Sequence, residues 1–216
     1  MDDLKQNIIH YALGNLIDLI GFAGRDRFND LAAEYNPFSL FPEGETVIMI
    51  GRRITRGSLR GVEEGTNLAD YGMFGLSWLN DEFLAQSTYN LAQFIERCGW
   101  EAMPVLPECG FRHERTNHSG AAAMPDFDYA AVACGLAEIG LNGQLLTKEF
   151  GSRQRFQMLI TNARLAGDPL LEKPVCDQCG LCAAICPLQA IDAGQLKDRV
   201  VCGKSMPVAR CDESLC

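Results

Sequence analysis

Apolar and polar positions recur along the chain with two different spacings, and these spacings predict its helices and strands. Over residues 3–22, apolar side chains return every three or four positions, which is the spacing of one helical face. The same spacing returns over residues 79–98, and Gly99 stands where a helix is expected to end. A third helix is predicted to open at Pro125-Asp126 and to continue to Leu136.

Short apolar runs predict four strands. The segment 46–51 is rich in β-branched residues and reads as a buried strand, whereas the segment 101–106 is a strand weakened by its proline. Two further strands are predicted near 143–148 and 155–161. Because helices and strands alternate, we expect a layered α/β or α+β domain.

The cysteines divide the chain into two parts. Of the ten cysteines, only Cys98, Cys109 and Cys134 lie in the first 175 residues, and seven lie between Cys176 and Cys216. Crowding of this kind in a reducing compartment favours metal ligation over disulfides. We therefore predict an α/β domain over residues 1–170 and a metal-binding segment over residues 171–216.

One run of cysteines carries the chemistry. Cys176, Cys179, Cys182 and Cys186, followed by Pro187, have the C-x2-C-x2-C-x3-C-P spacing of bacterial ferredoxins. Three thiolates on a tight loop can each reach one iron of a [4Fe-4S] cubane. The sequence therefore predicts a [4Fe-4S] cluster and one-electron redox chemistry.

The number of clusters stays open at this point. In two-cluster proteins the fourth cysteine of such a run serves the other cluster, so Cys186 either completes the first site or begins a second. The remaining candidate ligands are Cys202, Cys211 and Cys216, whose spacing does not repeat the run. Gly180 permits the close wrap that the loop needs.

Other site chemistries find less support. Paired C-x2-C units also hold structural zinc, but four cysteines this close, followed by proline, fit zinc ribbons badly. A c-type haem would require Cys-x-x-Cys-His, which does not occur. Neither a dinucleotide-binding glycine pattern nor a phosphate-binding P-loop appears, so we expect an electron-donor protein as partner.

Charge and hydropathy restrict the setting. The 216 residues carry a formal net charge of -9, which argues against a nucleic-acid partner. The N-terminus lacks a basic region ahead of an apolar run, and no stretch is long enough for a membrane span, so we expect a cytoplasmic protein. One basic island, at residues 52–60, is either a solvated loop or a dock for an anionic group.

Beyond the cysteine run, the sequence resembles the epoxyqueuosine reductase and reductive dehalogenase family. The family's Gly-Leu-Gly-x-x-Gly-x-Asn stretch is similar to the segment that holds Gly135, Gly140 and Asn142, and its later leucine and glycine positions match 145–151. The N-terminal segment GFAGRDRF and the helix ahead of Gly99 are also similar. The resemblance thus spans most of the chain.

The resemblance implies a nitroreductase-like domain that cradles cobalamin and a ferredoxin-like tail that passes electrons to the cobalt. It makes Gly135, Gly140 and Asn142 candidate cofactor-binding residues. It also places a further cluster cysteine near Cys202, which implies a second cluster held by Cys186, Cys202, Cys211 and Cys216. An oxygen-sensitive protein suited to anaerobic conditions is expected.

The sequence departs from the family at one catalytic position. The family's queuosine enzymes carry an acid in an Asp-Ser-Ala-Pro segment, where this chain reads Gly-Ala-Ala-Ala-Met-Pro over 120–125. Asp126 and Asp128 follow closely, and no catalytic residue is assigned. Three hypotheses remain: a cobalamin-dependent oxidoreductase, an electron carrier without cobalamin, and a redox sensor. The oligomeric state is not predicted.

Overall fold

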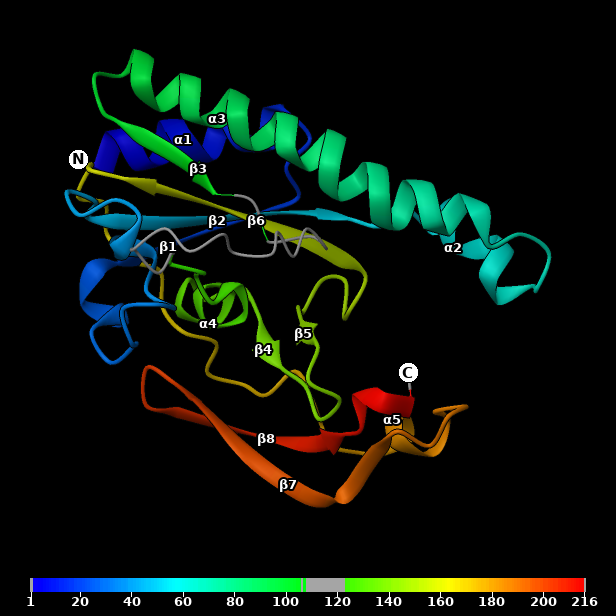
Figure 1. The fold of residues 1–216 in the computed structure, drawn as a ribbon. Coiled ribbons are helices and arrows are strands. Elements are labelled where there is room, and N and C mark those ends of the chain that lie inside the picture. The colour runs from blue at the N-terminus through cyan, green and yellow to red at the C-terminus, as the bar shows by residue number, and fades with distance from the viewer. Residues whose placement is uncertain (1, 106, 108–122, 216) are drawn as a thin grey trace, which may run out of the picture.

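The computed structural model describes residues 2–105, 107 and 123–215, and it stacks helices on both faces of a sheet (Figure 1). The helices are α1 (Asp2–Gly14), α2 (Arg56–Glu63), α3 (Ala85–Arg97), α4 (Phe127–Ala133) and α5 (Leu181–Ala184). The strands are β1 (Leu19–Gly24), β2 (Thr46–Arg53), β3 (Ala102–Val105), β4 (Glu138–Ile139), β5 (Leu145–Leu146), β6 (Gln154–Thr161), β7 (Ile191–Val201) and β8 (Lys204–Cys211). Two π-helical segments, Tyr71–Ser77 and Leu79–Leu84, run directly into α3.

The main sheet has the strand order β1-β2-β6-β3, and each neighbouring pair is antiparallel. Because side chains alternate across a strand, β2 supplies both faces of the core. Ile48 and Ile50 pack with residues of α1 and α3, whereas Val47 and Met49 pack with residues of α4. The two helical layers therefore enclose the sheet, as Figure 1 shows.

The C-terminal segment lies beyond α4 (Figure 1). Strands β7 and β8 form an antiparallel hairpin, and Val201 and Met206 join the core cluster that contains Val47. No residue over 171–189 is buried. The hairpin thus docks on the main core, whereas the cysteine-rich loop has no apolar core of its own.

The four strands predicted from the sequence are present, whereas β1, β4, β7 and β8 are not predicted by it. The predicted strands at 46–51 and 101–106 correspond to β2 and β3, and those near 143–148 and 155–161 correspond to β5 and β6. Pro104 lies in β3, which pairs only with β6 and is therefore an edge strand, where proline is tolerated. The mixed α and β composition is confirmed, with antiparallel sheets.

The helical predictions are confirmed with one correction. The helix over 79–98 and the helix opening at Pro125-Asp126 are present, the latter as the shorter α4. The predicted helix over 3–22 is wrong beyond Gly14, because Leu16 takes a left-handed conformation with φ of 63° and β1 begins at Leu19. Among the described helices, none is both long enough and apolar enough to cross a membrane.

Candidate functional site

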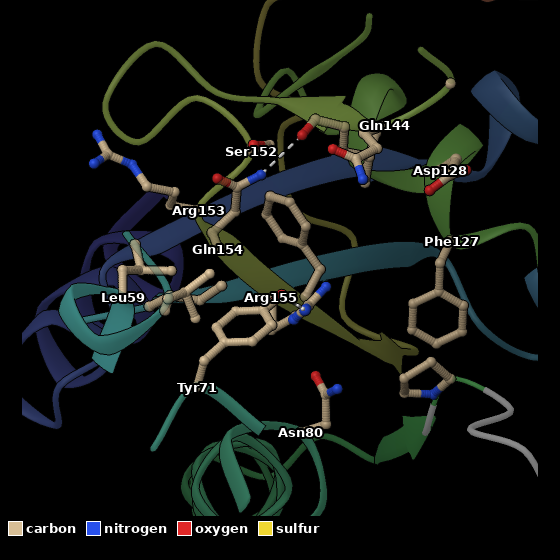
Figure 2. A pocket seen from close by; sticks show the side chains of 16 residues that line it. Leu59, Tyr71, Asn80, Phe127, Asp128, Gln144, Ser152, Arg153, Gln154 and Arg155 are labelled. Atoms are coloured by element: carbon tan, nitrogen blue, oxygen red, sulfur yellow. Dashed lines mark hydrogen bonds between the residues drawn. The ribbon is translucent and has the colours of Figure 1, made fainter. Parts of the chain in front are cut away.

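A cleft of about 700 Å³ opens between α2, the π-helical segments, the start of β6, the β4–β5 hairpin and the start of α4 (Figure 2). A volume of this order suits a small-molecule ligand. Aromatic rings line it together with side-chain amides and two arginines. These lining residues include Tyr71, Asn80, Phe127, Asp128, Gln144, Arg153, Gln154, Arg155 and Phe156.

Helix α4 brings Phe127 and Asp128 to one side of the cleft. Asp126 caps the helix by accepting a hydrogen bond from the backbone N–H of Tyr129 at 2.9 Å, which fixes where the first turn begins. Burial, together with the nearby charge of Asp126, raises the pKa of Asp128, and Arg199 opposes the shift. The cleft therefore contains a carboxyl group that keeps its proton to higher pH than an ordinary aspartate.

Tyr71 and Asn80 face the cleft from the opposite side (Figure 2). Arg155 holds Tyr71, since its guanidinium donates to the phenol oxygen at 3.2 Å and to the carbonyl of Gly75 at 3.2 Å. The side chain of Gln157 donates to the carbonyl of Asn80 at 2.8 Å. Strand β6 thus fixes the π-helical wall of the cleft.

The β4–β5 hairpin touches both the cleft and the cysteine run. Gly143, Gln144 and Leu145 line the cleft, and Gln154 of β6 holds their strand by donating to the Leu145 carbonyl at 3.0 Å. On the same hairpin, the backbone N–H of Leu141 donates to the sulfur of Cys176 at 3.4 Å. Leu141, which contacts the first cysteine of the run, is therefore only two residues before Gly143, which lines the cleft.

The cysteine run forms a tight loop around Gly180, and its last cysteine is held by backbone hydrogen bonds. Gly180 adopts a left-handed conformation with φ of 73°, in agreement with the close wrap expected at that position. Backbone hydrogen bonds from Ala190 and Leu188 hold the pKa of the Cys186 thiol below its usual range. Cys176, Cys182 and Cys186 are partly exposed, and Cys179 is exposed.

Cys211 lies close to the end of this loop. It is the strand partner of Ile191, and the next residue, Asp212, donates its N–H to the Ala190 carbonyl at 2.8 Å. Ala190 therefore contacts both the Cys186 sulfur and the backbone beside Cys211. Cys216 lies outside the described residues.

Cys202 lies at the other end of the hairpin. Its sulfur contacts the Arg27 carbonyl at 3.6 Å and the Tyr129 hydroxyl at 3.9 Å, and burial raises its pKa. The eight-residue strand β8 leads from this end to Cys211, a distance on the order of 25 Å at the usual rise of a strand. The two cysteines thus lie at opposite ends of β8, and their assignment to a second cluster stays a prediction.

Within the described ranges, no three His, Cys, Asp or Glu side chains converge closely enough to hold a single metal ion. A cubane spaces its ligands farther apart than one ion does, because each thiolate binds a different iron. The ligand assignments to Cys176, Cys179, Cys182 and Cys186 stay predictions.

The three residues suggested by the resemblance are not among those that line the cleft. A side chain at Gly135 would collide with the Pro169 carbonyl, and one at Gly140 would collide with Leu146. The side chain of Asn142 accepts from the Gln144 N–H at 3.3 Å and so shapes the turn that carries Gly143. Their proposed contact with a cofactor stays a prediction.

The other sequence candidates have structural roles. In the basic island, Arg53, Arg56 and Arg60 pair with acidic side chains, and Arg52 donates to the carbonyl of Phe83. Cys134 is buried, as expected of a small apolar residue, whereas Cys98 is exposed at the end of α3. Cys109 lies outside the described residues.

The aromatic and amide residues of the cleft have no signal in the sequence. Tyr71 and Asn80 lie in a stretch whose spacing looks irregular, because a π-helix shifts the register of its faces. Phe127 and Gln144 follow predicted boundaries, where side-chain direction depends on the turn. The sequence indicates Asp128 together with Asp126, as an acid that follows the segment 120–125, but assigns it no catalytic role.

Comparisons with known proteins confirm the predicted resemblance. No family model matches the chain. Tetrachloroethene reductive dehalogenases of Desulfitobacterium hafniense and Dehalobacter restrictus are 34% identical to it over 111 residues, which is 50% of this chain and 17% of theirs. The chain thus spans less than a fifth of the length of these curated relatives.

Solved structures show the same fold. The epoxyqueuosine reductase of Streptococcus thermophilus matches with a TM-score of 0.63 and 19% identity, over 87% of this chain and 53% of that protein. A catabolic reductive dehalogenase in complex with 3-bromo-4-hydroxybenzoic acid matches with a TM-score of 0.59 and 18% identity, over 95% of this chain and 27% of that protein. Another similar structure is that of a reductive dehalogenase whose dehalogenation is B12-dependent. The structural neighbours of the chain are epoxyqueuosine reductases and reductive dehalogenases.

Proposed function

We propose that this chain is the redox unit of a cobalamin-dependent reductase, in which a [4Fe-4S] cluster passes electrons to a corrinoid in the cleft. The similarity to B12-dependent reductases supports a reductase-related role. The cluster, the corrinoid and the direction of electron flow are our proposal.

The contact between the β4–β5 hairpin and Cys176 carries this proposal. The Leu141 N–H binds the Cys176 sulfur, and the nearby residues Gly143 and Gln144 line the cleft. A cluster at Cys176 would therefore lie behind the cleft wall, separated from the cleft by one hairpin. Such closeness favours electron transfer between the two sites.

The chemistry of the cleft lining fits a corrinoid. A corrin ring is broad, flat and largely apolar, and its rim bears amide arms. Phe127, Tyr71 and Phe156 offer apolar faces, while Asn80 and Gln144 offer amide donors and acceptors. When bound, the cobalt would supply the reducing chemistry, and the protein would bind and orient the group and the substrate.

Cys176, Cys179 and Cys182 are the proposed ligands of the first cluster, with Cys186 or Cys211 as the fourth. Both of these cysteines lie at the same end of the β7–β8 hairpin, next to Ala190. The sulfur of Cys202 faces Arg27 and Tyr129 instead. Without it, the remaining cysteine of the pair and Cys216 are too few for a second cubane, so one cluster is proposed.

Asp128 is the proposed proton donor. A reduction that breaks a bond to carbon consumes protons as well as electrons, and the carboxyl of Asp128 lines the cleft with a raised pKa. It lies three residues beyond the segment in which the resemblance places an acid. This assignment would account for the departure at 120–125.

The electron-donor protein is proposed to approach from the exposed side of the cysteine loop. Cys179 is exposed, and apolar side chains stand in water beside it, with Leu181 62% and Ile185 76% exposed. Exposed apolar side chains next to a redox centre are typical of a transient partner surface. No nucleic-acid partner is proposed.

The test is an iron and cobalt count on protein purified without oxygen from cells supplied with cobalamin. Wild-type protein is expected to hold four iron atoms for each cubane that it binds, and one cobalt per chain. Asn80→Trp should fill the cleft and lower the affinity for cobalamin about ten-fold or more, which corresponds to roughly 1.4 kcal/mol of lost binding, so the cobalt content falls while iron stays unchanged.

Gln86→Trp is the matched control, because Gln86 is exposed on α3 beyond the π-helical wall. It should leave both metals at the wild-type level. Iron without cobalt in the wild type would contradict the corrinoid proposal and favour the electron carrier. Absence of iron would contradict the cluster itself.

A further inference from the structure

The cluster site is backed by a buried ion pair that the redox chemistry does not otherwise explain. Glu138, in β4, is 6% exposed, and one of its carboxylate oxygens forms an ion pair with the Lys204 ammonium at 3.4 Å. Lys204 also donates to the Leu171 carbonyl at 2.9 Å. Burying a carboxylate is costly, so a buried one needs partners of this kind.

The second oxygen of Glu138 reaches the cysteine run itself. It accepts hydrogen bonds from the backbone N–H groups of Val175 and Cys176, the latter at 3.4 Å. The negative charge therefore contacts the backbone of the first cluster cysteine, and the positive charge of Lys204 lies one contact farther away. The pair comes from two elements, β4 and β8, which the fold brings together behind the loop.

We propose that Glu138 and Lys204 position Cys176 and set the reduction potential of the cluster bound there, Glu138 lowering it and Lys204 raising it. The inference rests on the proposed function, since it requires a cluster at Cys176. Nearby charges and hydrogen bonds to the sulfurs are what tune such potentials. Because Glu138 is buried, its charge is weakly screened, whereas the charge of the partly exposed Lys204 is screened more.

This arrangement explains two features of the sequence at once. A charged residue in β4 would be unexpected in a two-residue strand of a core hairpin, and a lysine at the start of β8 would be expected to point into water. Both are accounted for when the pair acts on the loop at Val175 and Cys176. The Leu141 N–H, which binds the Cys176 sulfur from the same hairpin, adds to this control.

The experiment is a potentiometric titration of the cluster, followed by electron paramagnetic resonance, on the full chain purified without oxygen. Glu138→Gln keeps the shape and one acceptor oxygen but removes the negative charge, so the potential should shift upward. Lys204→Gln removes the positive charge, so the potential should shift downward by a smaller amount. The double variant should show a smaller upward shift than Glu138→Gln alone, because the two effects are opposite in sign but unequal in size.

Glu172→Gln is the matched control, because Glu172 carries the same charge three residues before Val175 but is exposed to water. It should leave the potential near the wild-type value. A mere packing role for the pair would give shifts of the same sign in both single variants, or none. Either result, with iron retained, would overturn the inference.

The outcome for the pair is distinguishable from the outcome for the proposed function. Wild-type protein with iron but without cobalt would remove the corrinoid and leave the inference standing, because the cluster can still be titrated. Wild-type protein without iron would overturn both. If the Glu138→Gln variant loses its iron, the test rests on Lys204→Gln. A reduction potential that does not shift downward in that variant would overturn the inference.

Discussion

The two regions of this molecule are held together in different ways. In the main sheet, the central strand β2 is buried along six successive residues and β6 has seven buried positions out of eight. In the C-terminal segment, ten of the eleven residues of β7 are at least partly exposed, and nothing over 171–189 is buried. The first region is stabilised by apolar burial, whereas the cysteine loop of the second has no apolar core of its own, and we expect its order to depend on the proposed cluster.

Removing a proposed cluster ligand is expected to give the largest difference between the two regions. Cys179→Ser is expected to lose the cluster, and the loop over 171–189 should then lose its protection from amide hydrogen exchange, while β2 and β6 keep theirs. The measurement is hydrogen exchange by mass spectrometry on both proteins. Cys98→Ser is the control, since Cys98 is exposed at the end of α3. Equal protection of the loop in both variants would mean that the segment is stable without metal.

Truncating one leucine in each region should show the same contrast in stability. Leu159 is fully buried in β6, so Leu159→Ala should lower the unfolding free energy by about 2–5 kcal/mol. Leu181, 62% exposed in the cysteine loop, should change it by no more than about 0.5 kcal/mol. Denaturant unfolding measures both. Comparable losses would refute the view that the loop contributes no apolar core.

Burial of Asp128 should make the stability of the main domain depend on pH. Its pKa is raised above the ordinary aspartate value of 3.8, so the folded chain holds this proton more tightly than the unfolded chain does. Its contribution to stability is therefore lost as pH rises from about 3.8 through the raised value. Asp128→Asn should remove this loss, becoming more stable than the wild type above that window and equal to it below. Denaturant unfolding across this pH range measures the difference.

Asp126→Asn serves as the control for this titration, since asparagine keeps the helix cap but changes the neighbouring charge. It should lower the pKa of Asp128 without abolishing its titration. If Asp128→Asn follows the wild-type pH profile throughout, the burial of this carboxyl has no energetic consequence. The same variant should slow substrate reduction if Asp128 donates the proton.

The sequence predicts the main domain better than the C-terminal segment. The reason is again the difference in apolar burial. Hydrophobic spacing locates β2, β3, β6 and the long helix, because burial in a core imposes a regular pattern on each. It could not locate β7 and β8, since exposed strands need no apolar alternation. The cysteine spacing predicts the chemistry of the loop but not which distal cysteine lies near it.

The cleft could be predicted only in part because it depends on tertiary packing. Tyr71, Phe127 and Gln144 are far apart in the sequence and meet only when the π-helical segments, α4 and the β4–β5 hairpin are in place. The pair of Glu138 and Lys204 is similar, because the two residues come from distant parts of the chain with no local signal for their contact. The resemblance to known reductases predicts a cobalamin-binding domain but none of these contacts.

The smallest expected effect lies inside the cored region, at the point where the helix prediction failed. Leu16 holds a left-handed φ of 63° and is 71% exposed, so its backbone is strained while its side chain buries little apolar surface. Leu16→Gly should therefore raise the unfolding free energy by about 0.5–1 kcal/mol, because glycine adopts this conformation at little steric cost. Leu13→Gly, at an exposed helical position of α1, should instead lower it by about 1 kcal/mol. Opposite signs, with iron content unchanged in both variants, would show that the strain at Leu16 belongs to the main domain and is independent of the cysteine-rich segment. A loss of unfolding free energy in both would show that Leu16 contributes packing.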